Sequence, residues 1–129
     1  MAEQFRALPQ HYSQFDLKLA WQVKKEPGRT VVEGIAKNVR FAFMYDLEIW
    51  VTALDRHGKA QARSMSFIIP HRLDLDQSAP FTVKLPEQAP GTRLRITYRY
   101  RGSDGGDDEG FFGEGGIPWS QTFDTVVPG

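Results

Sequence analysis

The stretch TRLRITYRYR, residues 92–101, decides the predicted fold, because from Arg93 onward apolar side chains alternate with polar, mostly charged ones. Alternation with a period of two is typical of a β-strand that buries one side and exposes the other to water. The strand therefore packs on a core through one face only, as in an antiparallel sheet. The side chains expected to point inward are Leu94, Ile96, Tyr98 and Tyr100, and those expected to point outward are Arg93, Arg95, Thr97, Arg99 and Arg101.

Six further segments carry the same kind of pattern, separated by turn signals such as Pro27–Gly28. In the first of them, residues 15–24, Phe15 and Leu17 are expected to point inward and Asp16 outward. In the fourth segment, residues 61–69, the side chains of Met65, Phe67 and Ile69 are expected on one face. Helical periodicity is absent apart from one turn within 71–77. The sequence therefore predicts an all-β, seven-stranded antiparallel two-sheet sandwich of immunoglobulin or fibronectin type III kind. The six segments are 15–24, 30–38, 45–55, 61–69, 80–86 and about 117–126.

Length and composition narrow the class of protein. A chain of 129 residues suits one domain, which we expect over 14–127, after an N-terminal tail at 1–13 and with a glycine-rich acidic loop at 102–116. The net charge is zero, which gives no global attraction for nucleic acid or anionic membranes. The absence of cysteine excludes disulfides, thiolate zinc sites and cysteine nucleophiles.

The expected location follows from what the N-terminus lacks. The opening residues, MAEQFRALPQ, do not form a signal peptide, and no stretch is apolar enough to insert into a membrane. We therefore expect a cytoplasmic protein by default, or an envelope-associated one if the sequence has been trimmed. The sequence sets no oligomeric state.

The stretch VVEGIAKNVRFAFMYDLEIWVTALDRHGK, residues 31–59, resembles the FxLYD-type domains of bacterial proteins. The resemblance extends over about 30–86, although the motif that names the family is not retained. It implies a small immunoglobulin-like sandwich, accessory or envelope-associated, with no catalytic residues to transfer. The residues that carry it are Gly34, Asn38, Asp55, Gly58 and Lys59, followed by the strand at 80–86.

Strand parity sorts the connections between the two ends of the sandwich. If the chain reverses at each one, three tight turns lie at one end and the irregular segments, including 38–45, 70–80 and 102–116, lie at the other. Clustered loops on a rigid frame are typical of binding sites. We therefore predict a non-catalytic module that binds a protein or peptide partner at the loop end, or through an edge strand. The candidate binding residues are Phe41, Phe43, Phe111 and Phe112.

Two alternatives remain at that end. In the first alternative, Phe41 and Phe43 do not bind a partner but fold back and close the top of the core. In the second, the loops bind a small ligand, such as a carbohydrate, or calcium, although the acidic spacing does not match an EF-hand and we expect no metal or cofactor. The oxygen donors for calcium would be Asp74, Asp76, Asp104, Asp107 and Asp108.

The arginine row of 92–101 has a structural explanation that we prefer to nucleic-acid binding. On a neighbouring strand, Asp46 and Glu48 would pair with the arginines, and Trp50 would stack under one of them. An enzyme is not expected, because no nucleophile elbow, phosphate loop or HExxH motif is present. His57 and His71 are predicted at opposite ends of the sandwich.

Overall fold

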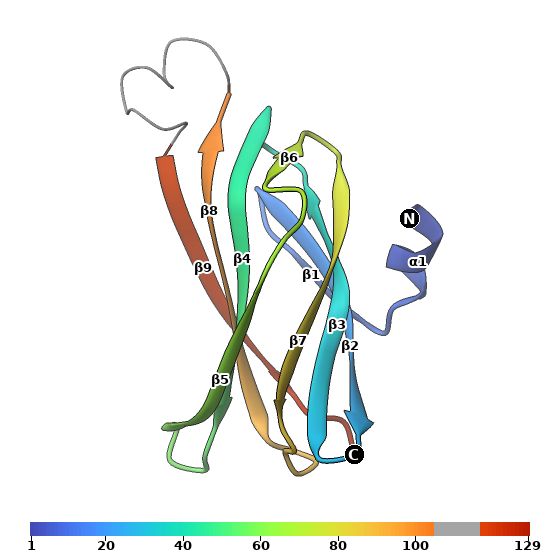
Figure 1. Ribbon diagram of the computed structural model, residues 1–129, viewed down its shortest axis with the longest axis vertical. Helices are drawn as coiled ribbons and strands as arrows, with labels where there is room; N and C mark the ends of the chain where they lie inside the picture. Colours follow the sequence, from blue (N-terminus) through green and yellow to red (C-terminus); the bar gives the residue numbers. More distant parts are fainter. Residues whose placement is uncertain (105–116) are drawn as a thin grey trace.

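The computed structural model describes residues 1–104 and 117–129, which form two antiparallel sheets packed face to face (Figure 1). Sheet A has the order β1-β2-β3-β7, and sheet B has the order β5-β4-β8-β9, with β6 paired to the upper part of β4. This arrangement confirms the predicted sandwich. The strands of sheet A are β1 (Gln10–Ser13), β2 (Leu17–Glu26), β3 (Arg29–Asn38) and β7 (Ser78–Pro86). Those of sheet B are β4 (Phe43–Leu54), β5 (Ala60–Phe67), β6 (Arg72–Asp74), β8 (Arg93–Ser103) and β9 (Ile117–Val126).

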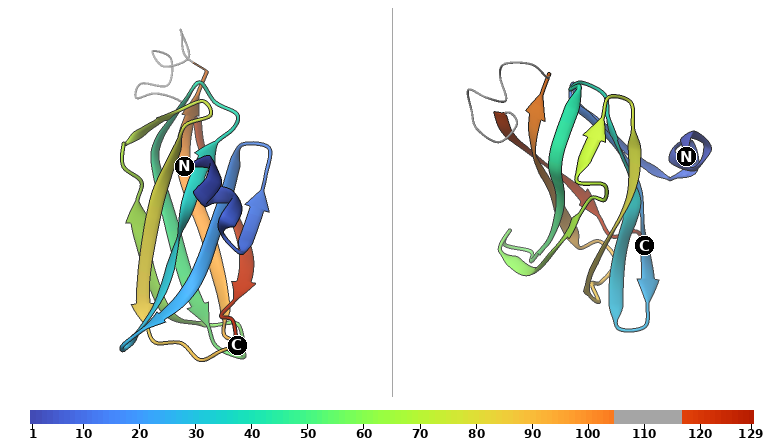
Figure 2. Two further views of the ribbon diagram at one scale, coloured as in Figure 1. Left: turned by 90° about the vertical axis from the view of Figure 1, so that its right-hand side faces the viewer. Right: turned by 45° about the horizontal axis from the view of Figure 1, so that its top comes forward.

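Two short strands and one helix add to the seven predicted strands. Helix α1 (Ala2–Ala7) buries none of its residues and lies beside the outer face of sheet A (Figure 2). Strand β1 pairs with β2, and its Tyr12 stacks on Phe123 of sheet B at 3.8 Å between ring centroids. The predicted tail at 1–13 is therefore structured, because this aromatic contact fixes it to the opposite sheet. Within the described residues, no helix has the length and apolar character needed to span a membrane.

The core between the sheets consists of the inward faces that alternation predicted. Leu94, Ile96 and Tyr98 of β8 are at most 1 % exposed. Trp21 of β2 lies opposite Gly34 of β3, where no side chain fits, because a Cβ there would come within 2.0 Å of the Ala20 carbonyl oxygen. The inward positions of β2, β4 and β7 add Leu17, Leu19, Trp21, Leu47, Ile49, Val51, Ala53, Phe81, Val83 and Leu85, and β3 adds Val32 and Ala36.

Three apolar residues expected in the core are exposed instead. Phe67 and Ile69 are 62 % and 81 % exposed. The register of β5 explains Phe67 and also Met65, because they pair with Glu48 and Trp50 on the outer face of β4. The next residue, Ile68, is buried in the core instead. Phe15 is 53 % exposed because it lies in the turn before β2, where the alternation has not yet begun.

Asp16 was expected to point outward but is fully buried. It lies in the turn between β1 and β2, one residue before β2, so the outward phase of that strand does not apply to it. Its carboxylate accepts hydrogen bonds from the Tyr98 hydroxyl at 2.8 Å and from the Tyr100 hydroxyl, both on β8 of the opposite sheet. Its backbone oxygen accepts a bond from the Val39 amide at 3.1 Å. Asp16 therefore joins both sheets and the β3–β4 connection.

The two tyrosines are held in their neutral form. Burial raises the pKa of both the Tyr98 and the Tyr100 hydroxyls well above the ordinary value, and the hydrogen bond to the Asp16 carboxylate raises it further. A tyrosinate here would lose its donated bond and face a carboxylate at short range. The arrangement therefore requires that both tyrosines keep their protons.

This requirement predicts a loss of stability in alkali. Near pH 10 an unfolded tyrosine begins to lose its proton, whereas folded Tyr98 and Tyr100 keep theirs, so the folded state binds more protons and the free energy of unfolding falls as pH rises. For each tyrosine the slope is about 0.7 kcal/mol per pH unit at pH 10, where half of the unfolded side chains are ionised, and it approaches about 1.4 kcal/mol per pH unit toward pH 11. Urea unfolding between pH 9 and pH 11 measures it. Tyr98→Phe should make the slope shallower, and an unchanged slope would contradict the assignment.

Candidate functional site

The connections divide between the two ends of the sandwich as strand parity predicted (Figure 1). The turns β2–β3, β4–β5 and β7–β8 share one end, where Gly28, Gly58 and Gly91 adopt positive φ angles of 74°, 81° and 86°. The β3–β4 connection and the segment around β6 lie at the other end, beside the C-terminal end of β8. This second end is the loop end. Phe111, Phe112, Asp107 and Asp108 lie outside the described residues.

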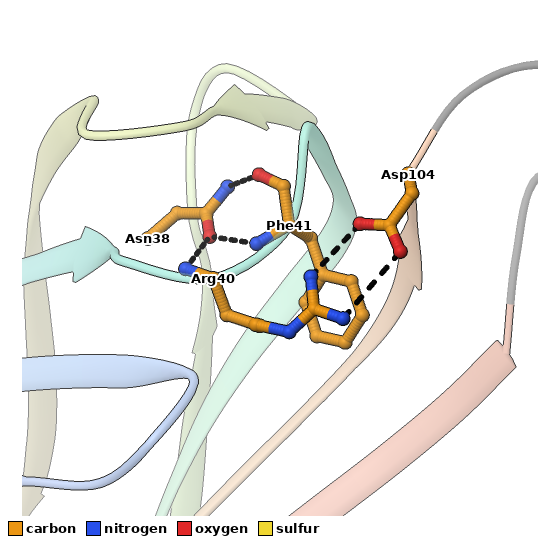
Figure 3. A network of polar contacts seen from close by, with 4 residues as sticks. All are labelled: Asn38, Arg40, Phe41 and Asp104. Atoms are coloured by element: carbon orange, nitrogen blue, oxygen red, sulfur yellow. Dashed lines mark hydrogen bonds and ion pairs between the residues drawn. The ribbon is translucent and has the colours of Figure 1, made fainter.

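Asn38 organises the loop end. It is fully buried, its side-chain amide donates to the carbonyl oxygens of Phe41 and Leu73, and its Oδ1 accepts from the Arg40 and Phe41 amides (Figure 3). Its own backbone pairs with Asp76 and Gln77. One side chain therefore holds the β3–β4 connection against the segment around β6. All four bonds of its carboxamide go to backbone groups of these two segments.

Phe41 closes the core rather than standing free. Its ring lies against Gly102 of β8, where an added Cβ would come within 2.8 Å of it, and its centroid is 5.7 Å from that of Tyr100. The Arg40 guanidinium covers the ring at 4.8 Å and binds Asp104 at 2.9 Å (Figure 3). Phe41 is partly buried and packs against the core cluster. These contacts are those of a side chain that covers the end of the core.

The described carboxylates proposed for calcium are engaged in other contacts and are not grouped around one point. Asp74 binds Arg72 at 3.0 Å and Asp104 binds Arg40. Asp76 adopts a positive φ of 66° and donates its amide to the Asn38 carbonyl oxygen. Among residues 1–104 and 117–129, no three acidic or histidine side chains are grouped closely enough to hold a metal ion.

The outer face of sheet B carries a row of aromatic side chains along β4. Phe43, Tyr45 and Trp50 form this aromatic row, and each is partly exposed. Each ring lies under an arginine, with Arg72 at 4.6 Å from the Phe43 centroid, Arg101 at 5.8 Å from Tyr45 and Arg63 at 5.1 Å from Trp50. Phe43, predicted at the loop end, is the member nearest that end.

The arginine row of β8 points outward as predicted, and most of it is neutralised. Arg101 binds Asp46, and Arg93 and Arg95 both bind Asp124 of β9, at 3.7 Å and 3.0 Å. These pairs support the interpretation of a charged outer face. The stacking on Trp50 comes from Arg63 of β5, whose position depended on a register that the sequence pattern did not specify.

Arg99 differs from its neighbours. Glu48 lies directly opposite it on β4, yet the Glu48 carboxylate accepts a hydrogen bond from Trp50 Nε1 at 2.8 Å. Within the described ranges, no carboxylate forms an ion pair with Arg99 or with Arg63, and both side chains are exposed. Two guanidinium groups on this surface are therefore without a carboxylate partner among the described residues.

Arg99 lies between two open hollows of the outer face. One, of about 200 Å³, is lined by Trp50, Thr52, Arg63, Thr97 and Arg99. The other, of about 360 Å³, extends from Arg99 toward β9 and includes Asp46, Glu48 and Ser120. The first hollow has two unpaired cations and no carboxylate in its lining. We refer to it as the arginine hollow.

Solved structures with the same architecture exist at low sequence identity. The GAE domain of GGA2p from Saccharomyces cerevisiae superposes with a TM-score of 0.60 at 8 % identity, over 94 % of this chain and 99 % of that one. The putative ApaA protein from Bordetella pertussis gives 0.58 at 14 % identity, over 90 % and 95 %. At these identities the likeness shows the fold alone. No family model and no curated protein sequence matches the chain.

Asn38 and Arg40 allow a test of what holds the loop end together. Asn38→Ala would leave buried backbone groups without partners, and we expect it to lower the free energy of unfolding by at least about 2 kcal/mol. Arg40→Ala removes an exposed ion pair from the same connection and should cost less than about 1 kcal/mol. Urea unfolding of both variants measures the difference, and equal losses would refute the role of Asn38.

Proposed function

We propose that the protein is a non-catalytic interaction module that binds an acidic, extended segment of a partner protein on the outer face of sheet B. One observation carries this proposal. Arg63 and Arg99 line one hollow and neither forms an ion pair with a described carboxylate, while Glu48, which lies opposite Arg99, accepts a hydrogen bond from Trp50. Two guanidinium groups around one space form a site for a carboxylate, which each can bind through paired N–H groups.

The surroundings of the arginine hollow suit a peptide. Phe67 is 62 % exposed on the same face, opposite Glu48, and Met65 lies opposite Trp50. An apolar side chain of the partner would remove Phe67 from water, and an acidic side chain beside it would enter the arginine hollow. Aromatic and arginine residues are the types that dominate binding energy at protein interfaces.

A long polyanion suits this face less well than a short acidic segment. Asp46, Glu48 and Asp124 lie among the arginines, so a nucleic-acid backbone that crossed the sheet would meet carboxylates as often as free cations. Of the arginines on the strands of sheet B, only Arg63 and Arg99 are without an ion pair to a described residue. This supports a partner that presents one or two carboxylates.

The other functional hypotheses have weaker support. Calcium bound by the loop-end carboxylates would have to displace Arg72 from Asp74 and Arg40 from Asp104. For catalysis, His57 in the β4–β5 turn and His71 before β6 lie at opposite ends of the sandwich. A partner that binds the loop end would find Phe41 already packed against the core.

Peptide selection tests the proposed partner chemistry. We expect a random peptide library displayed on phage to yield sequences with Asp or Glu next to an apolar residue. Arg99→Glu should weaken the selected peptide at least tenfold, because it replaces a charge-assisted bond with repulsion. Lys84→Glu changes the net charge equally on an exposed position of sheet A and should leave affinity unchanged. Fluorescence polarisation measures both.

Amide chemical shifts locate the bound peptide independently of any substitution. On titration, the perturbed resonances should cluster at Trp50, Phe67 and Arg99. Selected peptides without acidic residues, or shifts confined to the loop end, would contradict the proposal. A melting shift with millimolar calcium or with simple sugars would favour the small-ligand alternative instead.

A further inference from the structure

Strand β9 forms a long edge of sheet B (Figure 1). It has ten residues and pairs with β8 from Ile117 to Val126 without a register shift. Among the described residues, its backbone hydrogen bonds within 117–126 go to β8 only. Its other side therefore presents unpaired N–H and C=O groups, which can accept a further strand.

The other edges carry features that discourage pairing. Strand β7 has Pro80, Lys84 and Pro86 exposed, and proline removes a donor while lysine opposes an approaching strand. Strand β1 has four residues only. The β4–β5 pairing contains a bulge between Ala53 and Leu54, and Arg63 is exposed on β5. Proteins commonly use such features to keep edges from associating.

Strand β9 has little of this protection. Its only charged residue, Asp124, is neutralised by Arg93 and Arg95 of its own neighbour β8. Its only proline is Pro118, the second residue, which leaves eight residues free of proline. Five of the ten residues are threonine, tryptophan, phenylalanine or valine, types that favour strands, and none of the ten is glycine.

The inward side of this edge is apolar and only partly covered. Ile117 is 55 % exposed and Trp119 is 41 % exposed. Phe15, on the rim of sheet A, is 53 % exposed and contacts the Trp119 ring edge-on at 5.5 Å between centroids. A strand added to β9 would bring its own inward side chains over these rings. Pairing would therefore satisfy backbone groups and remove apolar surface from water together.

We propose that the occupant of this edge is a second copy of the chain, paired antiparallel through β9 across a two-fold axis at Gln121 or Thr122. An antiparallel pair centred on a residue places inward side chains of one copy opposite inward side chains of the other. Gln121 and Thr122 are the two residues nearest the middle of the strand. In the first register Trp119 faces Phe123 of the other copy, so each apolar side covers the other. An isologous contact of this kind closes on itself as a dimer.

The charge pattern of β9 is compatible with a second copy. In the register centred on Gln121, Asp124 lies opposite Pro118 of the other copy, and in the register centred on Thr122 it lies opposite Ser120. No like charges meet along the strand in either register. The formal net charge of the chain is zero, so two copies approach without overall repulsion. This inference does not depend on the proposed function, because the arginine hollow lies on the β5 side of β8.

Sedimentation velocity over a concentration series tests the dimer. We expect the mass of the wild-type protein to rise from that of one chain toward that of two. The double variant Ser120→Glu, Thr122→Glu should stay monomeric, because it sets acidic groups of the two copies against each other. Lys84→Glu makes the same change in net charge on the β7 edge and should behave as wild type. Circular dichroism confirms that each variant is folded.

The absence of cysteine permits a second test that identifies the interface itself. Gln121→Cys or Thr122→Cys places one thiol on the two-fold axis, where the two copies are close enough to form a disulfide on mild oxidation. One of the two variants should cross-link in high yield, and Lys84→Cys should not. The proposal is overturned if the wild-type protein is monomeric throughout, if the double glutamate variant dimerises as well as wild type, or if neither cysteine cross-links.

Discussion

The bonds between the Asp16 carboxylate and the hydroxyls of Tyr98 and Tyr100 are the constraint on which the rest of the structure depends. A carboxylate this deeply buried is tolerated only with donors around it, and both donors come from the opposite sheet. The bonds fix the position of β8 along the strand direction relative to the start of β2. The Asp16 carbonyl oxygen then fixes Val39, next to Asn38, so that the loop end is attached to the same point. With its tyrosines held inward, β8 must present its arginines outward.

Side-chain alternation predicted most of the fold, because a period of two is decisive wherever one face is apolar and the other charged. It succeeded for β8, where arginine alternates with leucine, isoleucine and tyrosine. It failed where a residue lies outside the strand, as Asp16 does, or where both faces carry apolar residues, as in β5. There the pattern does not distinguish Phe67 from its neighbours, and only the pairing with Glu48 places it outside. Strand β1 depends on a contact with Phe123, more than a hundred residues later in the chain.

The candidate site was accessible to sequence reasoning only in part. The outward arginines of β8 and their acidic neighbours on β4 follow from periodicity and strand order. Which arginine lacks an ion pair does not follow from them, because the Glu48 carboxylate opposite Arg99 accepts a hydrogen bond from Trp50 instead. Arg63 reaches Trp50 through the register of β5. The sequence around Phe41 does not indicate whether its ring covers the core or binds a partner. The ring packs on the core because Gly102 leaves space for it.

The buried aspartate also has a consequence for the order in which the chain can fold during synthesis. Tyr98 follows Asp16 by 82 residues, so the carboxylate must stay in water until β8 has been made. The β2–β3 hairpin has a local turn and can form early, but the two sheets cannot close over Asp16 before its partners arrive. A nascent chain that ends before β8 keeps a charged group where the finished protein has a dry interior. Closure of the sandwich is thereby linked to the near-completion of the polypeptide, which limits premature burial of the core.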